Sequence, residues 1–288
     1  MIKNLFNISD LSKKEILEII SVENDNKVLT NKNLGMIFEK YSTRTRLSFA
    51  VAISNLGGER IDIKFDELNF SRGESFADTF KTMNCYLDGL IYRTSNHDNL
   101  INASKYFKKP IINAMSDISH PCQILSDFYT LTNHFKKKEL NILWIGDMNN
   151  VCFSLVELAS IFEELNLYIY THEKISSKVN WKYTKNVILE HNFKNINLDT
   201  IDCVMTDVFI SMNDSEENLN KEHYLKNFIV DSKLMNQTNK NCIFMHCLPA
   251  KIGSEVSKEV IEGQKSIVWQ QAQNRMILQK KLLQCISW

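Results

Sequence analysis

Short apolar segments alternate with amphipathic helical patterns along most of this chain. Segments typical of strands lie at 34–38, 89–92, 110–113, 141–145, 167–170, 203–206 and 242–246. Apolar residues at helical spacing follow several of them, as Phe49, Ile53 and Leu56 do after the first. Such alternation is typical of parallel sheets with crossover helices. We therefore predict an α/β protein in which each parallel sheet is flanked by helices.

The length of the chain predicts two domains. With 288 residues, the chain can form about two units that each bury a core. A charged stretch from Lys136 to Glu139 separates the two halves. We expect one domain over 1–134 and a second over 135–288, the second ending in a helix at about 271–286.

Charge and cysteine content argue against several classes of protein. The chain has 34 basic and 34 acidic residues, which disfavours a nucleic-acid binder held by bulk positive charge. It has no run of 18 apolar residues and no apolar core of a secretory signal near its start, so we expect no membrane span and no export. Seven cysteines without a C-x-x-C pair favour reduced thiols in the cytoplasm over disulfides or a zinc site.

The segment Ser42-Thr43-Arg44-Thr45-Arg46 lies between a predicted strand and a predicted helix. Backbone N–H groups at a helix start are unpaired and lie at the positive end of the helix dipole. The hydroxyl and guanidinium groups add donors, and a hydrogen bond from arginine to phosphate contributes about 1.5–3 kcal/mol. The segment predicts a site for a phosphate-like anion. The alternative is a capping Ser or Thr followed by solvated arginines.

Three more polar residues are expected at the same edge of the first sheet. Arg93 ends a strand, and His120 and Gln123 lie at the next turn from strand to helix. Histidine can donate to a carbonyl oxygen, and glutamine can bind an amide-like group as donor and acceptor. Ligand sites of α/β proteins gather at this edge. We predict that these residues join the anion site, although a lone histidine at a helix start is more often a cap or a surface residue.

Polar turns follow three strands of the second half. They span 146–150, 207–212 and 245–250, and they offer a carboxylate, a hydroxyl, carboxamides and a thiol. Together these groups can bind the ammonium and carboxylate groups of an amino acid. Because Asp, Asn and Ser favour turns for local reasons, a purely structural role is equally open. The first turn is not G-x-G-x-x-G, so dinucleotide binding is poorly supported.

Taken in order, these motifs resemble the aspartate/ornithine carbamoyltransferase family, and its ornithine branch in particular. Phe38-Glu39-Lys40 followed by Ser42 to Arg46 resembles the family's carbamoyl-phosphate loop. The segments 120–123, 207–212, 246–249 and 274–275 resemble its other motifs in order and spacing. The resemblance covers nearly the whole chain. It implies transfer of a carbamoyl group from carbamoyl phosphate to the δ-amino group of L-ornithine, a step of arginine metabolism that needs no metal and no cofactor.

The resemblance also implies roles for individual residues. The residues implied to bind carbamoyl phosphate are Ser42, Thr43, Arg44, Thr45, Arg46, Asn69, Arg93, His120, Gln123, Cys247, Leu248 and Arg275. Those implied to bind ornithine are Asn150, Asp207, Ser211, Met212, Cys247 and Leu248. Those implied to act in catalysis are Arg44, Arg93, His120, Cys247 and Arg275.

Further expectations concern the assembly. The resemblance implies a cytoplasmic homotrimer with active sites at subunit interfaces, where a neighbouring subunit contacts the phosphate. Asn69 stands where the family commonly has Gln in this region. The last helix is expected to pack back toward the first domain, and Leu248–Pro249 is expected to be cis.

Two further positions depart from the family pattern. Asn213 follows Ser-Met where the family has Gly, in a loop that closes over the amino acid, and Lys251 follows Pro-Ala where the family has His. Putrescine or an N-acylated ornithine is the alternative substrate, although Asp207, Ser211 and Met212 favour a free α-amino acid. A binding protein without turnover is disfavoured because every implied catalytic side chain is present. The same residues serve arginine synthesis and arginine breakdown.

Overall fold

The computed structural model describes residues 2–23, 26–210 and 220–288, which form two compact units. The first unit comprises Met1–Tyr129 and Gln273–Trp288, and the second comprises Thr130–Ala272. Each unit contains one parallel sheet flanked by helices, so the predicted α/β class is confirmed.

The first unit has a four-stranded sheet in the order β2-β1-β3-β4. Its strands are β1 (Asn33–Phe38), β2 (Glu59–Lys64), β3 (Gly89–Arg93) and β4 (Ile111–Met115). Its helices are α1 (Lys13–Ser21), α2 (Arg44–Asn55), α3 (Phe76–Tyr86), α4 (Asp98–Tyr106) and the first part of α5 (Pro121–His134). Short 3-10 helices lie at Ile8–Asp10, Phe65–Glu67 and Asn69–Arg72. The capping box that Ser12 and Glu15 predict is present at the start of α1.

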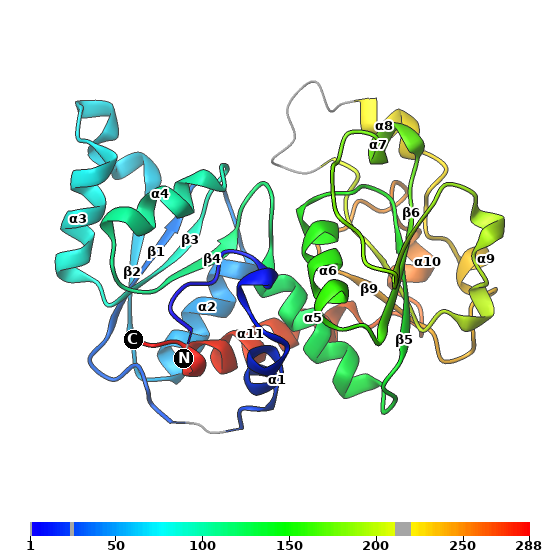
Figure 1. Ribbon diagram of the computed structural model, residues 1–288, viewed down its shortest axis with the longest axis horizontal. Coiled ribbons are helices and arrows are strands. Elements are labelled where there is room, and N and C mark those ends of the chain that lie inside the picture. The colour runs from blue at the N-terminus through cyan, green and yellow to red at the C-terminus, as the bar shows by residue number, and fades with distance from the viewer. Residues whose placement is uncertain (1, 24–25, 211–219) are drawn as a thin grey trace. The chain divides into compact units, whose positions relative to one another are not determined.

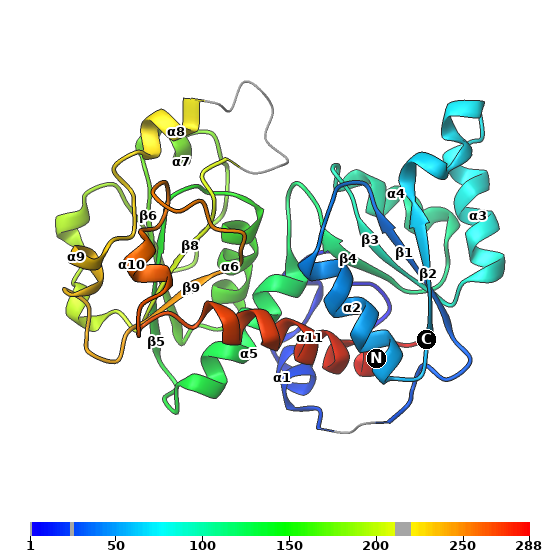
Figure 2. The same ribbon diagram turned by 180° about the vertical axis from the view of Figure 1, so that it is seen from behind.

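Helices cover both faces of this sheet. The helices α3 and α4 lie over one face (Figure 1), and α2 lies over the other (Figure 2). Phe80, Leu90 and Phe107 belong to the core under α3 and α4 and are at most 1% exposed. Full burial of such a side chain contributes about 1.5–3 kcal/mol. This core fixes β1 and β3, whose carboxyl ends carry candidate site residues.

The C-terminal helix α11 (Val268–Cys285) joins the first unit from Gln273 onward. The two ends of the chain lie side by side (Figure 1), because Ile2 N donates to Cys285 O at 3.1 Å and Ser287 N donates to Ile2 O at 2.9 Å. The C-terminal helix therefore packs against the N-terminal region, as predicted.

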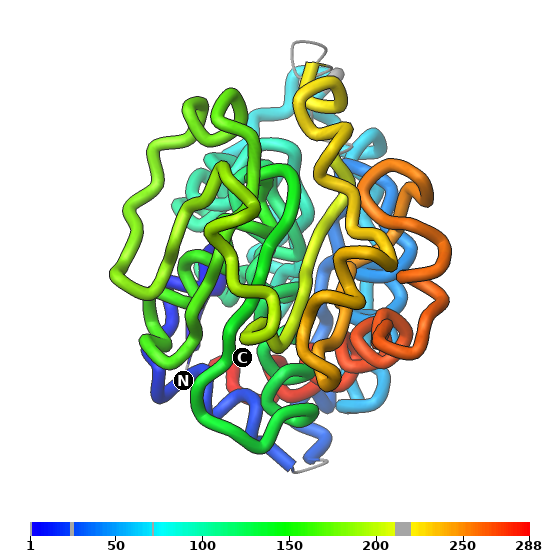
Figure 3. Tube along the Cα trace, turned by 90° about the vertical axis from the view of Figure 1, so that its right-hand side faces the viewer, coloured from blue at the N-terminus to red at the C-terminus, as the bar shows by residue number. Residues whose placement is uncertain are grey.

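The second unit has a five-stranded sheet in the order β7-β6-β5-β8-β9. Its strands are β5 (Leu140–Ile145), β6 (Leu165–Tyr170), β7 (Val187–Glu190), β8 (Cys203–Thr206) and β9 (Ile243–His246). In Figure 3 this order runs from the light-green segment of β6 and β7, through the green β5, to the orange segment of β9. Its helices are α6 (Asn150–Ile161), α7 (Glu173–Ser176), α8 (Asn220–Leu225), α9 (Ser232–Met235) and α10 (Lys258–Ile261), with 3-10 helices at Phe193–Asn195 and Leu198–Thr200.

The turn after β9 contains the predicted cis bond between Leu248 and Pro249. Within the described part of the chain, no helix combines the length and apolar character needed to span a bilayer.

Candidate active site

The anion loop of the first unit lies between β1 and α2. Helix α2 begins at Arg44 with Thr43 as its N-cap, and the Thr43 side chain makes no capping hydrogen bond. Thr43 is exposed and Ser42 is half-buried. The capping alternative therefore does not explain these hydroxyls. They lie beside the first N–H groups of α2, where an anion is favoured.

Two arginines far apart in the sequence are buried close to this loop. Arg93, at the end of β3, is 6% exposed, and Arg275, on α11, is 3% exposed. The Arg275 Nη2 atom donates to Thr45 Oγ1 at 2.6 Å. Burial, followed by the positive charges of Arg275 and Arg44, lowers the pKa of Arg93 to about 10. Gathering desolvated like charges is unfavourable unless an anion neutralises them, so this cluster has the character of an anion site.

His120 contributes a neutral donor to the same cluster. Burial, followed by the positive charges of Arg275 and Arg93, holds the pKa of His120 well below its usual value. The imidazole is therefore neutral at physiological pH, with one N–H that can donate to a carbonyl oxygen. His120 is only 5% exposed and lies near two arginines, which does not fit the alternative of a surface or capping histidine.

The two residues after Pro121 differ in role. Cys122 is fully buried, its Sγ donates to Asn113 O at 3.3 Å, and burial raises the pKa of its thiol to about 12, so it is a packing residue. Gln123 is also fully buried, and its Nε2 donates to Asp127 Oδ1 at 2.9 Å. The sequence analysis did not predict a role for Asp127. Residues four apart on a helix lie on the same face, so its spacing from Gln123 could have indicated this contact.

The structure does not bring Arg46 and Asn69 into this cluster. The Arg46 guanidinium pairs with Asp62 on β2, with Nε and Nη2 each 3.1 Å from Oδ1. Asn69 is exposed in the 3-10 helix Asn69–Arg72. The residues that do converge come from β3, α2, the start of α5 and α11.

Glu39 ties the anion loop to the end of β3, a role that the sequence motif containing it did not indicate. Its carboxylate accepts hydrogen bonds from the Tyr92 hydroxyl at 2.6 Å and from the Ser95 N and hydroxyl at 2.8 Å. These bonds tie the end of β1 to the end of β3. Its position just before Ser42 to Arg46 was the signal that could have indicated this role.

The turns of the second unit converge on Asp207. This carboxylate is 7% exposed and follows β8. Asn149 Nδ2 donates to its Oδ2 at 2.8 Å, and Cys247 Sγ donates to its Oδ1 at 3.0 Å. Local turn chemistry does not explain Asp207, because both bonds come from turns after other strands. Asn150, the first residue of α6, is also buried here. Ser211, Met212 and Asn213 lie outside the described residues.

Asn149 is also the N-cap of helix α6. Its Oδ1 accepts hydrogen bonds from Val151 N at 3.0 Å and Cys152 N at 3.1 Å. An asparagine at an N-cap contributes about 0.5–2 kcal/mol relative to alanine. One side chain therefore starts the helix with its oxygen and holds Asp207 with its nitrogen. The sequence had indicated Asn150 instead.

A buried pair fixes the turn that carries Cys247. His246 Nδ1 accepts a hydrogen bond from Leu248 N at 2.9 Å, and its Nε2 lies 3.2 Å from Glu255 Oε1. Because Nδ1 accepts, the ring proton is on Nε2 and is donated to Glu255. This pair orients the backbone on both sides of Cys247. Glu255, nine residues after His246, was not predicted.

Asp207, His246 and Cys247 each offer one atom that could ligate a metal ion. One donor atom of each lies within 4.8 Å of the others. Both nitrogens of His246 are engaged in hydrogen bonds, which leaves one carboxylate and one thiol. Zinc sites take three or four protein ligands, so this group fits a hydrogen-bonded network better than a metal centre.

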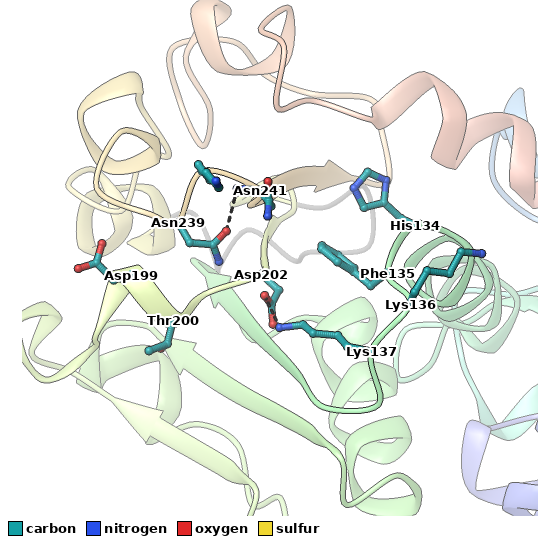
Figure 4. Close-up of a pocket in the computed structure, with 10 residues that line it drawn as sticks. His134, Phe135, Lys136, Lys137, Asp199, Thr200, Asp202, Asn239 and Asn241 are labelled. Carbon is teal, nitrogen blue, oxygen red and sulfur yellow. Dashed lines mark hydrogen bonds and ion pairs between the residues drawn. The ribbon is translucent and has the colours of Figure 1, made fainter.

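A cavity of about 850 Å³ lies at the opposite edge of the second sheet. Its lining residues precede β5, β8 and β9, and the Lys137 Nζ–Asp202 Oδ1 ion pair of 2.7 Å lies within it (Figure 4). Asp207 and Cys247 follow the same strands. The cavity is therefore separate from the group of residues around Asp207.

Both halves of the chain match models of one protein family. Residues 2–133 match the carbamoyl-P binding domain of aspartate/ornithine carbamoyltransferase, and residues 138–286 match its Asp/Orn binding domain. The chain is 36% identical to an ornithine carbamoyltransferase of Methanobrevibacter smithii, over 97% of this chain and 98% of the relative. It is 34% identical to an anabolic ornithine carbamoyltransferase of Campylobacter jejuni, over 98% and 96%.

Solved structures agree with these matches. An ornithine carbamoyltransferase from Pyrococcus furiosus is similar with a TM-score of 0.86 and 31% identity, over 99% of this chain and 96% of that one. The anabolic enzyme from Campylobacter jejuni is similar with a TM-score of 0.87 and 32% identity, over 98% of each chain. Sequence and fold together show that this chain belongs to the aspartate/ornithine carbamoyltransferase family.

Proposed function

We propose that this chain transfers the carbamoyl group of carbamoyl phosphate to the δ-amino group of L-ornithine, giving L-citrulline and phosphate. The observation that carries the proposal is the convergence of buried Arg93 and Arg275 with neutral His120 beside the Ser42–Arg46 loop. The relatives named above support ornithine as the acceptor, since they are named for it. They give no support to putrescine or N-acetylornithine.

The first domain, 1–134, together with Arg275 of the last helix, is assigned to carbamoyl phosphate. The hydroxyls of Ser42, Thr43 and Thr45 and the N–H groups of α2 bind the phosphate, which Arg44, Arg93 and Arg275 neutralise. His120 and Gln123 bind the carbamoyl group. Asn69 is assigned to the phosphate of a neighbouring subunit, which agrees with its exposed position.

The second domain, 135–288, is assigned to ornithine. The Asp207 carboxylate binds an ammonium group, and the Asn150 carboxamide binds the α-carboxylate. Ser211, Met212 and Leu248 complete this assignment on the basis of the family motifs. Cys247 is assigned to the reacting amine, because its thiol is held by Asp207 at 3.0 Å.

Chemistry of the transfer follows from these groups. The neutral δ-amino group attacks the carbamoyl carbon, the C–O bond to phosphate breaks, and the proton that the amine loses passes to the departing phosphate. The developing oxyanion is stabilised by Arg44, Arg93, Thr45 and the N–H of His120. One fixed donor of this kind contributes about 10²–10³ in kcat. Holding amine and electrophile in position lowers the barrier by about 7–11 kcal/mol.

Cys247 is assigned as an orienting and proton-handling group, not as a nucleophile. Its thiol proton is donated to Asp207, an arrangement that suits proton transfer near the amine. Mass spectrometry of enzyme quenched during turnover is expected to find no carbamoyl adduct on Cys247. A carbamoyl thioester at that residue would contradict the assignment.

The proposal also covers the oligomeric state, the cellular compartment and the direction of arginine metabolism. A homotrimer is supported by exposed apolar residues on α2, with Leu47 at 59% and Val51 at 46% exposed. A cytoplasmic location is supported by seven cysteines that form no disulfide among the described residues. Arginine synthesis is supported by the anabolic relative from Campylobacter jejuni.

The acceptor is tested by supplying carbamoyl phosphate with L-ornithine, putrescine or N-acetylornithine and measuring the ureido product colorimetrically. Only L-ornithine is expected to give rapid product formation. Faster reaction with either other amine would replace the assigned acceptor, and no product with any amine would refute the enzyme function.

A further inference from the structure

The amide of Gln123 has one engaged end and one open end. Its Nε2 donates to Asp127 Oδ1 at 2.9 Å, while its Oε1, also buried, has no hydrogen-bond partner among the described residues. Gln123 is 0% exposed and Asp127 is 1% exposed. Leaving a buried carbonyl oxygen unpaired is unfavourable, and native proteins rarely do so without a reason.

Asp127 determines which end of the amide is open. The Nε2–Oδ1 hydrogen bond presents the NH₂ group to Asp127 and leaves the carbonyl oxygen on the other side. An ionised carboxylate can only accept hydrogen bonds, so in that form Asp127 holds the amide in this orientation. The spacing of four residues on α5 puts the two side chains on one face of the helix.

Gln123 lies one turn from the candidate anion site. Gln123 N bonds to His120 O at 3.1 Å, so both residues belong to one turn at the start of α5. His120 is near the charges of Arg93 and Arg275. Gln123 Oε1 is therefore a buried acceptor on the turn that carries His120, and a ligand with an N–H donor would satisfy it.

We infer that Asp127 is a positioning residue that fixes the Gln123 amide as an acceptor and thereby selects carbamoyl phosphate over acyl phosphates. This inference rests on the proposed function. Carbamoyl phosphate carries an NH₂ group where acetyl phosphate carries a methyl group of similar size. The NH₂ donates to Gln123 Oε1, whereas the methyl group leaves that oxygen unpaired. Sites built to bond such a group reject analogues that lack it by factors of about 10⁴–10⁵ at the upper end.

The test measures the Kd of carbamoyl phosphate and of acetyl phosphate by calorimetry, without ornithine. In Asp127→Asn the partner can donate as well as accept, so the Gln123 amide can turn over. We expect the Kd of carbamoyl phosphate to rise and its preference over acetyl phosphate to fall by about tenfold or more. A residue that only stabilises the fold would weaken both anions equally and leave the preference unchanged.

Two further variants make the test specific. Asp127→Glu keeps a group that only accepts and is expected to retain the preference, even if both anions bind more weakly. Asp88→Asn removes a carboxylate of the same unit that accepts from Asn33 N at 2.9 Å, and it is expected to bind both anions as the wild type does.

Two results would overturn the inference. One is an unchanged preference in folded Asp127→Asn. The other needs no variant: a wild-type protein that binds acetyl phosphate as tightly as carbamoyl phosphate. Failure of the proposed function would look different from failure of this inference. In that case the wild type would bind neither of the two anions, or it would form no citrulline.

Discussion

The imidazole of His120 illustrates how neighbouring side chains set the chemistry of one residue. An unperturbed histidine titrates near pH 6.5, but burial and the nearby Arg275 and Arg93 keep His120 neutral well below that pH. A neutral imidazole can donate to a carbamoyl oxygen without adding charge to a crowded cationic site. The same burial makes protonation of this residue unfavourable in the folded state.

Acid stability tests this assignment at the residue scale. Below pH about 6.5 the unfolded chain binds a proton at His120 that the folded chain does not, so the free energy of unfolding falls as pH decreases from there toward the folded-state pKa. The slope from one such group is at most about 1.4 kcal/mol per pH unit. Denaturant unfolding of the wild type and His120→Asn at pH 7.5 and 5.5 is expected to show a smaller loss in the variant. Equal losses would indicate that His120 titrates normally.

At the scale of the element, helix α6 depends on Asn149 for its start, and Asp207 depends on it for its orientation. Asn149→Ala removes both interactions and is expected to lower the free energy of unfolding by about 0.5–2 kcal/mol. Asn149→Ser keeps a good N-cap but loses the amide that donates to Asp207. We expect near wild-type stability in the serine variant and a raised KM for ornithine in both. Urea unfolding and steady-state kinetics measure the two effects, and wild-type kinetics in Asn149→Ser would contradict the role in the site.

Strands that are buried on both faces have continuous apolar sequences, and these strands were predicted. Strands that are exposed on one or both faces lack such a sequence, and these were missed. The edge strand β2, Glu59–Lys64, is largely exposed and alternates polar with apolar residues, so its identity depends on pairing with β1. The second missed strand, β7, is four residues long at the other sheet's edge. Helix α4 was missed as well, since Asn-rich Asp98–Tyr106 is a weak helix former that is held by buried Leu100 and Ala103.

The sequence likewise indicated some of the candidate site residues and not others. Arg93, His120 and Asp207 were predictable because they follow strands of parallel sheets, whose carboxyl ends share an edge. The roles of Glu39 and Glu255 were not, because each depends on a partner that only the tertiary structure brings near. Sequence patterns thus indicated the polar residues at the strand ends better than the residues that hold them in place.

At the scale of the whole molecule, the proposed trimer is expected to depend on the exposed face of α2. Leu47 is an apolar residue that is 59% exposed, and Leu47→Glu puts a charge at this position. Light scattering after size exclusion is expected to give about three times the 33.5 kDa chain mass for the wild type and a smaller mass for the variant. Ile101→Glu, at a 44% exposed position on α4, is the matched control and should leave the mass unchanged. A monomeric wild type would contradict the assembly.

In the proposed function, the arginine cluster beside Ser42–Arg46 binds carbamoyl phosphate and promotes transfer of its carbamoyl group to ornithine. The most direct test is the initial rate of citrulline formation in the wild type, Arg44→Ala and Arg60→Ala. Arg60 is half-exposed and pairs with Asp62, so it serves as the control for loss of one arginine. We expect Arg60→Ala to keep near wild-type activity and Arg44→Ala to lose at least about 10²–10³-fold while remaining folded. Near-normal citrulline formation by Arg44→Ala would contradict the account.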